Sequence, residues 1–598
     1  MKINSIQISN ILSFKQFDNI DNSPQIKFND GLNIIIGPNG AGKSNFLEII
    51  NLVFNNVLFS SFSFNEQVIQ DHKLNDQVQL PNTIQIQNIN KNLPANNKSN
   101  SNVKQIKIVI GLNNNDKENL KFLRVNLDSL NKLSQKYSNS PFALPQTITD
   151  EDIDKINEIE LLIENSNKTS FNISTSFSNP IEMFVSIYLR LFNLIQYLII
   201  INNKEYGRSW KPLKNTFAII SGYRNYNQIL SDHTVQNEQN DLQQIKQKII
   251  QETTKSSTNE EPIVFSYVRH KLIYDYHRLR VKIGTPDNID PIDKFENPIF
   301  HSLNKILQLT LHIKIYLMRP NDNSLAYVMQ FIDTKTNKIV NVSELSAGEK
   351  GIIHFIFSIH GYDLENGVMI IDEPEIHLHP QIQEKYIDIL NEAIKDMKMQ
   401  FIVATHSPIL VNSKTIDSVK RFYKNKDDFT EIITSENTPK HHNLIKYLDY
   451  TKATQVLFSD HAVLVEGESD AFAYQHYYDH FKQRKGISKN LNFIHIVGVG
   501  AYSQWEKFFE DWKILTFFIR DLDDFGGGIE GIKQKYVENI FILRIGELED
   551  YIGRIKSENF HNAVDFCEHR YQNWFEDLSN TDKIKELDEI FDNILSKI

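Results

Sequence analysis

The 598-residue sequence predicts an α/β protein built from two successive parts. First, apolar runs of strand length alternate with helical patterns from residue 340 onward, which is typical of a parallel sheet covered by helices. Second, a glycine-rich segment, Gly37–Ser44, stands between an apolar run and a helical pattern. Third, two later apolar runs, Ala462–Val465 and Phe517–Ile519, are each followed by acidic residues. In both parts, polar side chains are therefore expected at the ends of strands.

The composition limits the classes of protein to which this chain can belong. Apolar residues make up 40% of the sequence, enough for globular cores, and the length implies two or three domains. No apolar run approaches the roughly 18–20 residues that span a bilayer, and Leu194–Ile201 is too short. Met1–Ser5 leads directly into a strand pattern, and the single cysteine, Cys567, excludes an internal disulfide framework. We expect an intracellular protein without membrane contact, cytoplasmic or nuclear according to its source.

The net charge of −11 argues against wholesale wrapping by nucleic acid but permits a local basic groove. The most basic and aromatic segment is Tyr267–Lys282. Its cations can contact phosphates and its tyrosines can stack on bases. A helix with a solvated basic face and a packed aromatic face explains the same pattern, and we favour that interpretation. The residues concerned are Arg269, Lys271, Arg278, Arg280, Lys282, Tyr267, Tyr274 and Tyr276.

The first 335 residues contain strand patterns, helical patterns and two very polar tracts. Leu32–Ile36 is an apolar run that ends at glycine, and isoleucines alternate with polar residues in 104–110. Residues 45–54 give the pattern of a buried helix, and mainly helical patterns fill residues 150–320. Residues 88–102 and 232–261 have so few apolar side chains that we expect disordered insertions at the surface.

Gly37–Ser44 matches G-x-x-x-x-G-K-[ST] in the required context, after a strand and before a helix. The pattern predicts a phosphate-binding loop whose backbone N–H groups close on the phosphates, aided by the N-terminus of the helix. We expect Lys43 to reach the β- and γ-phosphates of ATP and Ser44 to bind Mg²⁺. The predicted nucleotide contacts in this segment are Gly37, Asn39, Gly40, Gly42, Lys43, Ser44 and Asn45.

Two acids follow a second apolar run and suit the same chemistry. Val368–Asp372 has the pattern of a buried strand that ends in a carboxylate. Asp372 can bind the Mg²⁺ ion that accompanies the nucleotide. Glu373 follows, placed to polarise the attacking water. Because strands often end in acids, this pair alone is weak evidence.

Three further segments resemble parts of the ABC ATPases. Ser346–Glu349 resembles their signature loop, in which Ser346 and Gly348 would contact nucleotide. Residues 374–380 resemble their D-loop region. The strand pattern 401–404 ends just before His406, which resembles their switch histidine and is therefore a candidate catalytic residue. A lone histidine is more often a core residue, but the order and spacing of these segments favour the functional interpretation.

The chain thus resembles ABC-type ATPases of the SMC and RecF-like group, and Ile8–Phe14 resembles their opening strand. In that group, the signature loop of one subunit covers the ATP held by another. Since this chain has one of each motif, the resemblance implies a homodimer or a larger homo-oligomer. The long coiled-coil arm of the group is not found in this sequence. Gln228 is only a guess for its glutamine-bearing loop.

The acids of the last part of the chain suggest a metal site. Glu466 follows the run Ala462–Val465, and Asp521 and Asp523 follow Phe517–Ile519. Residues two apart on an extended segment project to one side, so both aspartates can face a site with Glu466. Hard oxygen ligands suit Mg²⁺ or Mn²⁺, and two such ions stabilise both oxygens of a phosphodiester displacement. A solvated acidic turn explains the aspartates alone about as well, but the combination with Glu466 is more specific.

This combination resembles the TOPRIM domain of topoisomerases, primases and nucleases. Residues 542–551 resemble the third acidic cluster of TOPRIM nucleases, with Glu547 as our first choice of metal ligand and Glu549 as the second. An ABC ATPase followed directly by TOPRIM is the arrangement of the overcoming-lysogenisation-defect (OLD) family. The Gabija nuclease subunit shares it, and PARIS defence components use related parts.

The resemblance implies an ATP-regulated, Mg²⁺-dependent endonuclease in defence or DNA repair. DNA is favoured over RNA as its substrate, and an accessory protein is a possible partner. The alternatives are an ATP-gated scaffold or sensor, and an SMC/RecF-like repair ATPase, each with a non-catalytic TOPRIM domain. We predict an ATPase domain in two pieces, 1–125 and 336–445, around a mainly helical insertion or dimerisation region at 126–335. A TOPRIM-like domain is predicted at 455–560 and a C-terminal helical segment at 561–598.

Overall fold

The structure of the protein is a computed structural model. It describes residues 1–598 apart from 59–92, 100–102, 138–147, 168–169, 176–179, 208–209, 212, 221–231, 235–262, 284–290, 319–325, 341–344, 362–363, 365, 377, 379, 435–441, 452, 497–501, 521–538, 544–547 and 553–558.

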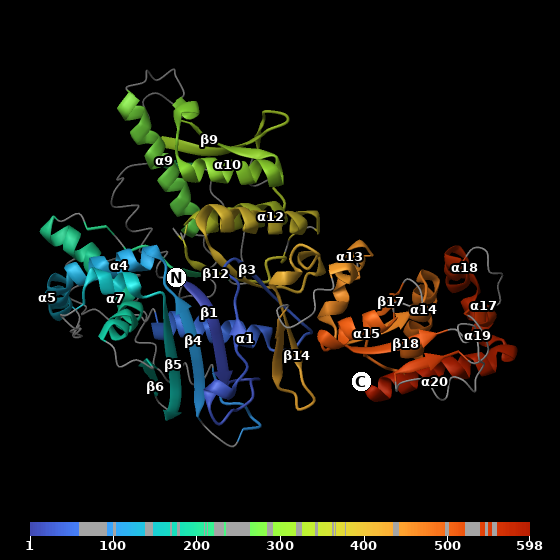
Figure 1. Cartoon of the computed structure of the whole chain (residues 1–598). Coiled ribbons are helices and arrows are strands. Elements are labelled where there is room, and N and C mark those ends of the chain that lie inside the picture. The colour runs from blue at the N-terminus through green and yellow to red at the C-terminus, as the bar shows by residue number, and fades with distance from the viewer. Residues whose placement is uncertain are drawn as a thin grey trace. The chain divides into compact units, whose positions relative to one another are not determined.

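The chain folds into two compact units, whose elements are labelled in Figure 1. The first unit comprises residues 1–35, 42–410 and 424–431. The second comprises residues 36–41, 411–423 and 432–598. Among the described helices, none combines the length and apolarity needed to cross a bilayer.

Four neighbouring strands of the first unit run parallel to one another in the order β3-β13-β12-β7. These are β3 (Leu32–Ile36), β13 (Gln400–Ala404), β12 (Val368–Asp372) and β7 (Phe217–Ile220). Helices α1 (Lys43–Leu52) and α12 (Pro380–Met397) contact β13. Strands covered on both faces read as continuous apolar runs, which is why β3, β12 and β13 stand out in the sequence. The register pairs Ala404 with both Ile35 and Asp372, so the carboxyl ends of three strands meet at one edge.

A second sheet of the first unit is antiparallel, in the order β2-β1-β4-β5-β6. Its strands are β1 (Lys2–Ser9), β2 (Ile26–Lys27), β4 (Lys104–Gly111), β5 (Glu158–Asn167) and β6 (Ser170–Thr175). Ile106, Ile108 and Ile110 are buried and alternate with partly exposed residues, which confirms the predicted half-buried strand. The helices of this part of the chain are α4 (Asn114–Val125), α5 (Leu127–Tyr137), α6 (Asp150–Lys155) and α7 (Pro180–Tyr206).

The first unit also contains a small antiparallel sheet in which β10 pairs with β8, β9 and β11. These strands are β8 (Asp232–Thr234), β9 (Ile313–Met318), β10 (Ala326–Asp333) and β11 (Ile339–Val340). The helices are α9 (Ile263–Ile283), α10 (Pro298–Leu311) and α11 (Ala347–Gly361), with the short turn η3 (Pro291–Lys294) before α10. Helix α9 contacts both β10 and α11. The region 126–335 therefore contains strands as well as the expected helices.

In the described part of the first polar tract, Leu93 and Asn96 are buried, whereas Pro94, Asn97 and Lys98 are exposed. Leu93 is buried, and its carbonyl oxygen accepts a hydrogen bond of 2.8 Å from the Lys104 ammonium. The Asn96 side chain donates to the Leu12 carbonyl over 2.7 Å. In the second tract, residues 232–234 form β8, and the rest of both tracts lies outside the described residues.

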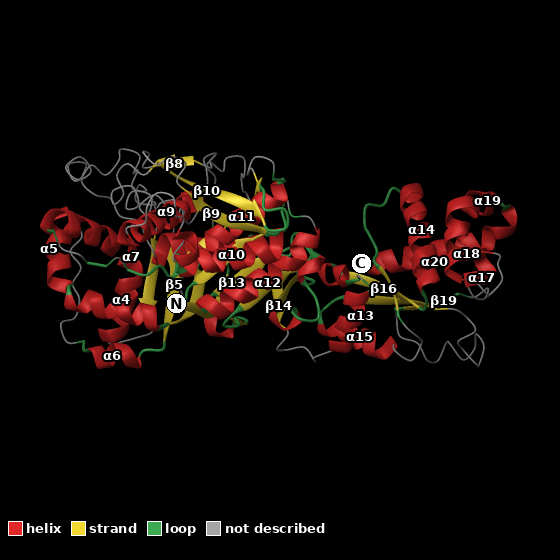
Figure 2. Cartoon of the chain, turned by 90° about the horizontal axis from the view of Figure 1, so that it is seen from above, coloured by secondary structure: helices red, strands yellow, loops and turns green. Residues whose placement is uncertain are grey.

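The second unit contains a parallel sheet in the order β17-β16-β18-β19. The strands are β16 (His461–Val465), β17 (Phe493–His495), β18 (Leu515–Arg520) and β19 (Ile540–Ile542). Helices α14 (Glu468–Lys485) and α20 (Thr581–Lys597) pack an aromatic core, including Tyr478, Phe481 and Phe591, against one face of the sheet. Helices α13 (His442–Tyr450) and α15 (Tyr502–Asp511) lie on the other side in Figure 2. The unit also contains α17 (Leu548–Ile552), α18 (Asn559–Asp565) and α19 (Tyr571–Glu576).

A buried arginine joins the preceding strand, β14 (Val419–Lys424), to this second unit. Arg421 is fully buried and donates to the carbonyl oxygens of Leu457 at 3.0 Å and Trp512 at 2.9 Å. Burial lowers the pKa of Arg421 to about 10, and the carbonyl acceptors take the place of lost water. This bonding explains why residues 411–423 belong to the same compact unit as the last part of the chain. The following strand, β15, covers Thr430–Thr434.

Candidate functional site

The glycine-rich segment joins β3 to α1, as the sequence predicts. The backbone has a positive φ at Gly40 and Gly42, and a Cβ atom at Gly42 would lie 2.3 Å from the Thr430 hydroxyl oxygen. Only glycine combines a positive φ with the absence of a Cβ atom, and Gly42 needs both. As the N-cap of α1, Gly42 has no side chain to bond the first N–H groups of the helix. The positive end of α1 is therefore presented where the pattern places phosphates.

The other predicted nucleotide contacts of this segment differ in their surroundings. Gly37 is buried, and a Cβ atom there would lie 2.1 Å from the Phe422 carbonyl oxygen. Asn39 and Ser44 are exposed. The Asn45 amide donates to the Ser13 hydroxyl over 3.0 Å, so in this structure it supports the loop.

Lys43 is a buried cation with three acidic residues nearby. Its side chain is only 5% exposed, and burial lowers its pKa to about 8. The negative charges of Glu373, Asp372 and Glu375 act in the opposite direction but do not compensate for the lost water. The fold therefore brings the lysine of the glycine-rich segment together with the acids after β12. An anion that enters this site restores the interactions that the ammonium group loses on burial.

Glu373 and His406 form a pair at the carboxyl edge of the sheet. Their side chains are half-exposed, and His406 Nε2 lies 3.7 Å from Glu373 Oε1. Glu373 has φ of +46°, a conformation that residues other than glycine rarely adopt, and its N–H donates to the Ala404 carbonyl at 2.9 Å. Partial burial and the charge of Lys43 lower the pKa of His406, although Glu373 opposes this. His406 is therefore mainly neutral at neutral pH.

Glu375 is a site residue that the sequence analysis placed only within the D-loop region. Its carboxylate accepts hydrogen bonds from the Thr405 hydroxyl at 2.8 Å and from the His406 N–H at 2.6 Å. Glu375 thus fixes the backbone that carries His406. The signal was present as a third acid close behind Asp372 and Glu373. His377 and His379 lie outside the described residues.

Ser346 caps the N-terminus of α11. Its backbone N–H donates to the Glu349 carboxylate over 2.9 Å, and the Glu349 N–H donates to the Ser346 hydroxyl oxygen over 3.2 Å. This reciprocal arrangement is a capping box. Ser346 is exposed, whereas Gly348 is buried in the first turn. The predicted signature loop therefore presents a serine and a helix N-terminus at the surface.

In the second unit, Glu466 lies at the carboxyl end of β16, beside the end of β18. The register pairs Leu464 with Phe518, and Arg520 Nε donates to Glu466 Oε1 at 3.4 Å. Arg520 is 8% exposed, so this contact brings an arginine and a carboxylate together in a partly desolvated place. Asp521 and Asp523 follow Arg520 in the sequence and lie outside the described residues, as does Glu547. Glu549 belongs to α17.

Asp470 is a second carboxylate that the sequence analysis did not assign. It lies in the first turn of α14, and its Oδ2 accepts the Gly467 N–H at 2.8 Å. This bond holds the carboxylate beside the backbone that follows Glu466. The four-residue spacing from Glu466 was the available signal. Among the described residues, no group of three or more histidines, cysteines and acids is placed to hold a metal ion.

The basic segment forms α9, largely as expected. Tyr267 and Tyr276 are buried, whereas Arg278 and Lys282 are exposed. Arg269 is the exception, because it is buried and cannot contact a partner at the surface.

The sequence also matches known protein families. The family model described as "AAA ATPase domain" matches residues 1–411. The chain belongs to this AAA ATPase family. A second model, "Overcoming lysogenization defect protein-like, TOPRIM domain", matches residues 457–523 of the same chain. The predicted order of an ATPase domain followed by a TOPRIM domain is confirmed.

Similar proteins include nucleases and ATPases. "Endonuclease GajA" of Bacillus cereus is 22% identical over 578 residues, which cover 85% of this chain and 73% of that protein. "OLD nuclease" of Thermus scotoductus is 32% identical over 117 residues, or 18% and 22% of the two chains. "Retron Ec83 probable ATPase" of Escherichia coli is 33% identical over 133 residues, or 20% and 24%. This AAA ATPase–TOPRIM chain is thus homologous to OLD and Gabija nucleases.

Proposed function

We propose that this AAA ATPase–TOPRIM protein is an ATP-regulated, Mg²⁺-dependent endonuclease that cleaves DNA in preference to RNA. The observation that carries the proposal is the meeting of Glu466 and Arg520 at the carboxyl edge of the TOPRIM sheet. Asp521 follows Arg520 directly in the sequence, and Asp523 follows two residues later. The similarity to proteins named endonuclease GajA and OLD nuclease supports the same chemistry.

The donor set at this edge fits a hard divalent cation. Glu466 and Asp470 supply carboxylates from neighbouring positions, and we assign Asp521, Asp523 and Glu547 as the other ligands. When bound, Mg²⁺ or Mn²⁺ would activate a water molecule and stabilise the leaving oxygen of the phosphodiester. Arg520 holds Glu466 in place and balances its charge. A bound cation would compete with Arg520 for that carboxylate.

In the ATPase domain, we assign Lys43 to the β- and γ-phosphates, with Ser44 and Asp372 as ligands of the accompanying Mg²⁺. The exposed hydroxyl of Ser44 at the start of α1 and the carboxylate at the end of β12 provide hard oxygen donors for that ion. Glu373 would orient and deprotonate the attacking water, and neutral His406, 3.7 Å away, would hydrogen-bond to the γ-phosphate or to that water. Glu375 is a positioning residue for His406.

We also propose that the protein acts as a homodimer or a larger homo-oligomer. The chain has one P-loop and one signature loop, and Ser346 is exposed at the N-terminus of α11. A helix N-terminus with an exposed serine is suited to contact the phosphates of ATP bound by a second copy. Sedimentation of ATP-trapped protein tests this assembly.

Cleavage assays with plasmid DNA and with RNA, each with Mg²⁺ or Mn²⁺ and with or without ATP, test the nuclease proposal. We expect metal-dependent cleavage of DNA by the wild type and a loss of at least about 100-fold in Asp521→Ala. ATP hydrolysis should remain within about twofold, because Asp521 belongs to the other catalytic domain. Cleavage by Asp521→Ala at the wild-type rate contradicts the metal site. Wild-type protein that cleaves neither substrate favours the ATP-gated scaffold.

A further inference from the structure

Cations gather on one face of α9 and on the adjoining turn η3, and of these Arg278, Lys282 and Lys294 are exposed whereas Lys271 is half-buried. Lys271, Arg278 and Lys282 are spaced seven and four residues apart, so they share one side of the helix. Lys294 belongs to η3. We name these four residues the α9 cationic face. Within the described part of the chain, Arg278, Lys282 and Lys294 form no ion pair, although the protein as a whole carries a net charge of −11.

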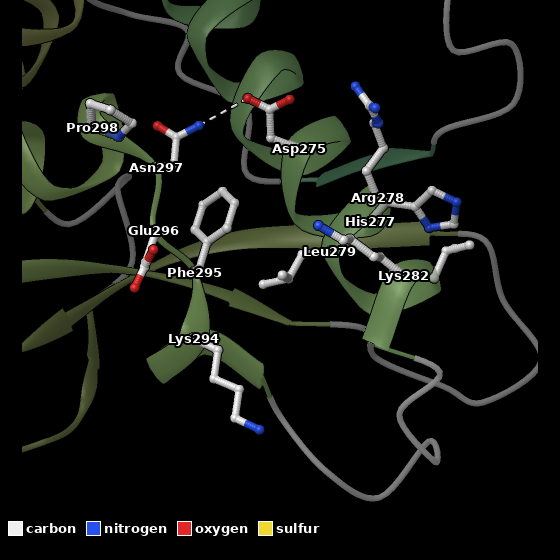
Figure 3. A pocket seen from close by; sticks show the side chains of 11 residues that line it. Asp275, His277, Arg278, Leu279, Lys282, Lys294, Phe295, Glu296, Asn297 and Pro298 are labelled. Atoms are coloured by element: carbon white, nitrogen blue, oxygen red, sulfur yellow. Dashed lines mark hydrogen bonds between the residues drawn. The ribbon is translucent and has the colours of Figure 1, made fainter.

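A pocket of about 790 Å³ lies at the end of this face, between α9, η3 and the start of α10. Lys282 of α9 and Lys294 of η3, both labelled in Figure 3, are among the residues that line it. Asp275 and Glu296 also line it. Asp275 accepts a hydrogen bond of 2.9 Å from the Asn297 amide, which links α9 to the cap of α10, and burial raises its pKa. The charges of Lys271 and Arg278 act on Asp275 in the opposite direction, so its carboxylate offsets part of the positive charge of this face.

Helix stability explains only part of this charge. Lys282 lies in the last turn of α9, where a cation interacts favourably with the helix dipole. That effect falls off within one turn of the helix. It therefore does not explain why a lysine stands at position 271, further back in α9, or at position 294, which belongs to another element. Two tyrosine rings also make cation–π contacts with cations of this face. The Lys271 ammonium lies 5.8 Å from the centre of the Tyr267 ring, and the Arg278 guanidinium lies 5.8 Å from that of Tyr274.

We propose that the α9 cationic face binds the phosphate backbone of a DNA strand, and this inference rests on the proposed nuclease function. From Lys271 to Lys282, the helix rises about 17 Å, the length of about five nucleotides along one strand. A free phosphate or nucleotide is too short to contact the whole face. Helix α9 packs against α11, the helix that begins directly after Ser346.

Binding of a labelled DNA oligonucleotide in EDTA, over a series of salt concentrations, tests this inference. The triple variant Arg278→Glu, Lys282→Glu, Lys294→Glu should bind at least about tenfold more weakly than the wild type. Its slope of log K against log salt should fall by about 2, because each lost contact with a single strand removes about 0.7. The matched control is Lys132→Glu, Lys155→Glu, Lys335→Glu, in which exposed lysines of the same unit undergo the same change of charge. The control should bind within about twofold of the wild type.

Three outcomes overturn the inference. The first is equal affinity of the two triple variants. The second is displacement of the strand by pyrophosphate at matched ionic strength, which would indicate a small-anion pocket. The third is wild-type protein that binds no DNA. If the triple variant does not fold, Lys294→Glu alone should still reduce the salt slope by about 0.7, and an unchanged slope overturns the inference.

Plasmid cleavage by the wild type with metal separates this inference from the nuclease proposal. Cleavage together with unchanged affinity in the triple variant removes the α9 cationic face and leaves the nuclease in place. Absence of both cleavage and binding in the wild type overturns both.

Discussion

The ATPase and TOPRIM domains each place a buried cation beside carboxylates at the carboxyl edge of a parallel sheet, but the two cations differ. In the ATPase domain, burial lowers the pKa of Lys43 to about 8 despite Asp372, Glu373 and Glu375 nearby. In the TOPRIM domain, Arg520 contacts Glu466 directly at 3.4 Å. A desolvated ammonium group attracts an anion, whereas an arginine bonded to a carboxylate balances the charge of a site that we propose for a cation.

The difference shows that an acidic strand end does not define the chemistry of a site by itself. Asp372 and Glu466 both follow apolar strands, and the sequence patterns around them are alike. What separates them is the cation that the rest of the fold brings to each. We propose that the ATPase edge receives phosphate and that the carboxylates of the TOPRIM edge receive metal.

The largest effect is expected from Glu373→Gln, which tests the acids of the ATPase edge. ATP hydrolysis should fall about 10²–10³-fold, because the amide cannot take a proton from water. ATP binding should change little, because Lys43 is unaltered. Turnover and equilibrium binding of ATP, measured on the same preparation, check both statements.

Lys43→Ala is the contrasting control for that experiment, since it should lose tight ATP binding itself. Glu373→Gln protein with trapped ATP should sediment as a dimer or a larger assembly. Equal hydrolysis by Glu373→Gln and the wild type, or a strict monomer with full ATPase activity, would contradict the assignment.

A smaller effect concerns pH and sharpens the contrast between the two cations. Lys43 has a lowered pKa in the folded, nucleotide-free protein, so it is charged below about pH 8 and loses its charge as pH rises through that value. ATP affinity should therefore fall above pH 8, approaching about tenfold per pH unit. Titrations of ATP binding between pH 7 and 9 measure this dependence.

Lys43→Arg provides the control for the pH dependence, because a guanidinium keeps its charge over that range. Its ATP affinity, even if lower, should stay constant with pH. Constant wild-type affinity between pH 7 and 9 would show that Lys43 does not titrate as we expect.

The elements that the sequence predicts best are those with a strong local signal. Buried parallel strands are continuous apolar runs, so β3, β12, β13 and β16 were recognisable, together with the loop that follows β3. The strands within 126–335 were not predicted individually, and they belong to three different sheets: β5 and β6 to the five-stranded antiparallel sheet, β7 to the parallel sheet, and β8, β9 and β10 to the small antiparallel sheet. In β9 the signal was present, since Ile313, Ile315 and Leu317 alternate with less buried residues.

The site residues missed in the sequence depend on contacts that form only in the fold. Glu375 acts through hydrogen bonds to residues 30 and 31 positions away, and Arg520 reaches Glu466 across 54 positions. For Arg269 the sequence suggested a phosphate contact that the fold does not allow, because this side chain is buried. The local sequence pattern predicts where a strand ends and which acid follows it. It does not predict which charged side chain from elsewhere in the sequence will lie beside that acid.

Mn²⁺ binding to nucleotide-free protein, counted by electron paramagnetic resonance, tests most directly whether the TOPRIM edge holds metal. Glu466→Gln and Asp521→Ala each remove a proposed ligand, and Glu510→Gln is a control at an exposed acid of the same unit. We predict that the wild type and Glu510→Gln bind Mn²⁺ alike, whereas Glu466→Gln and Asp521→Ala bind at least about tenfold more weakly. Unchanged Mn²⁺ affinity and stoichiometry in both ligand variants would contradict a metal-dependent nuclease centre at this edge.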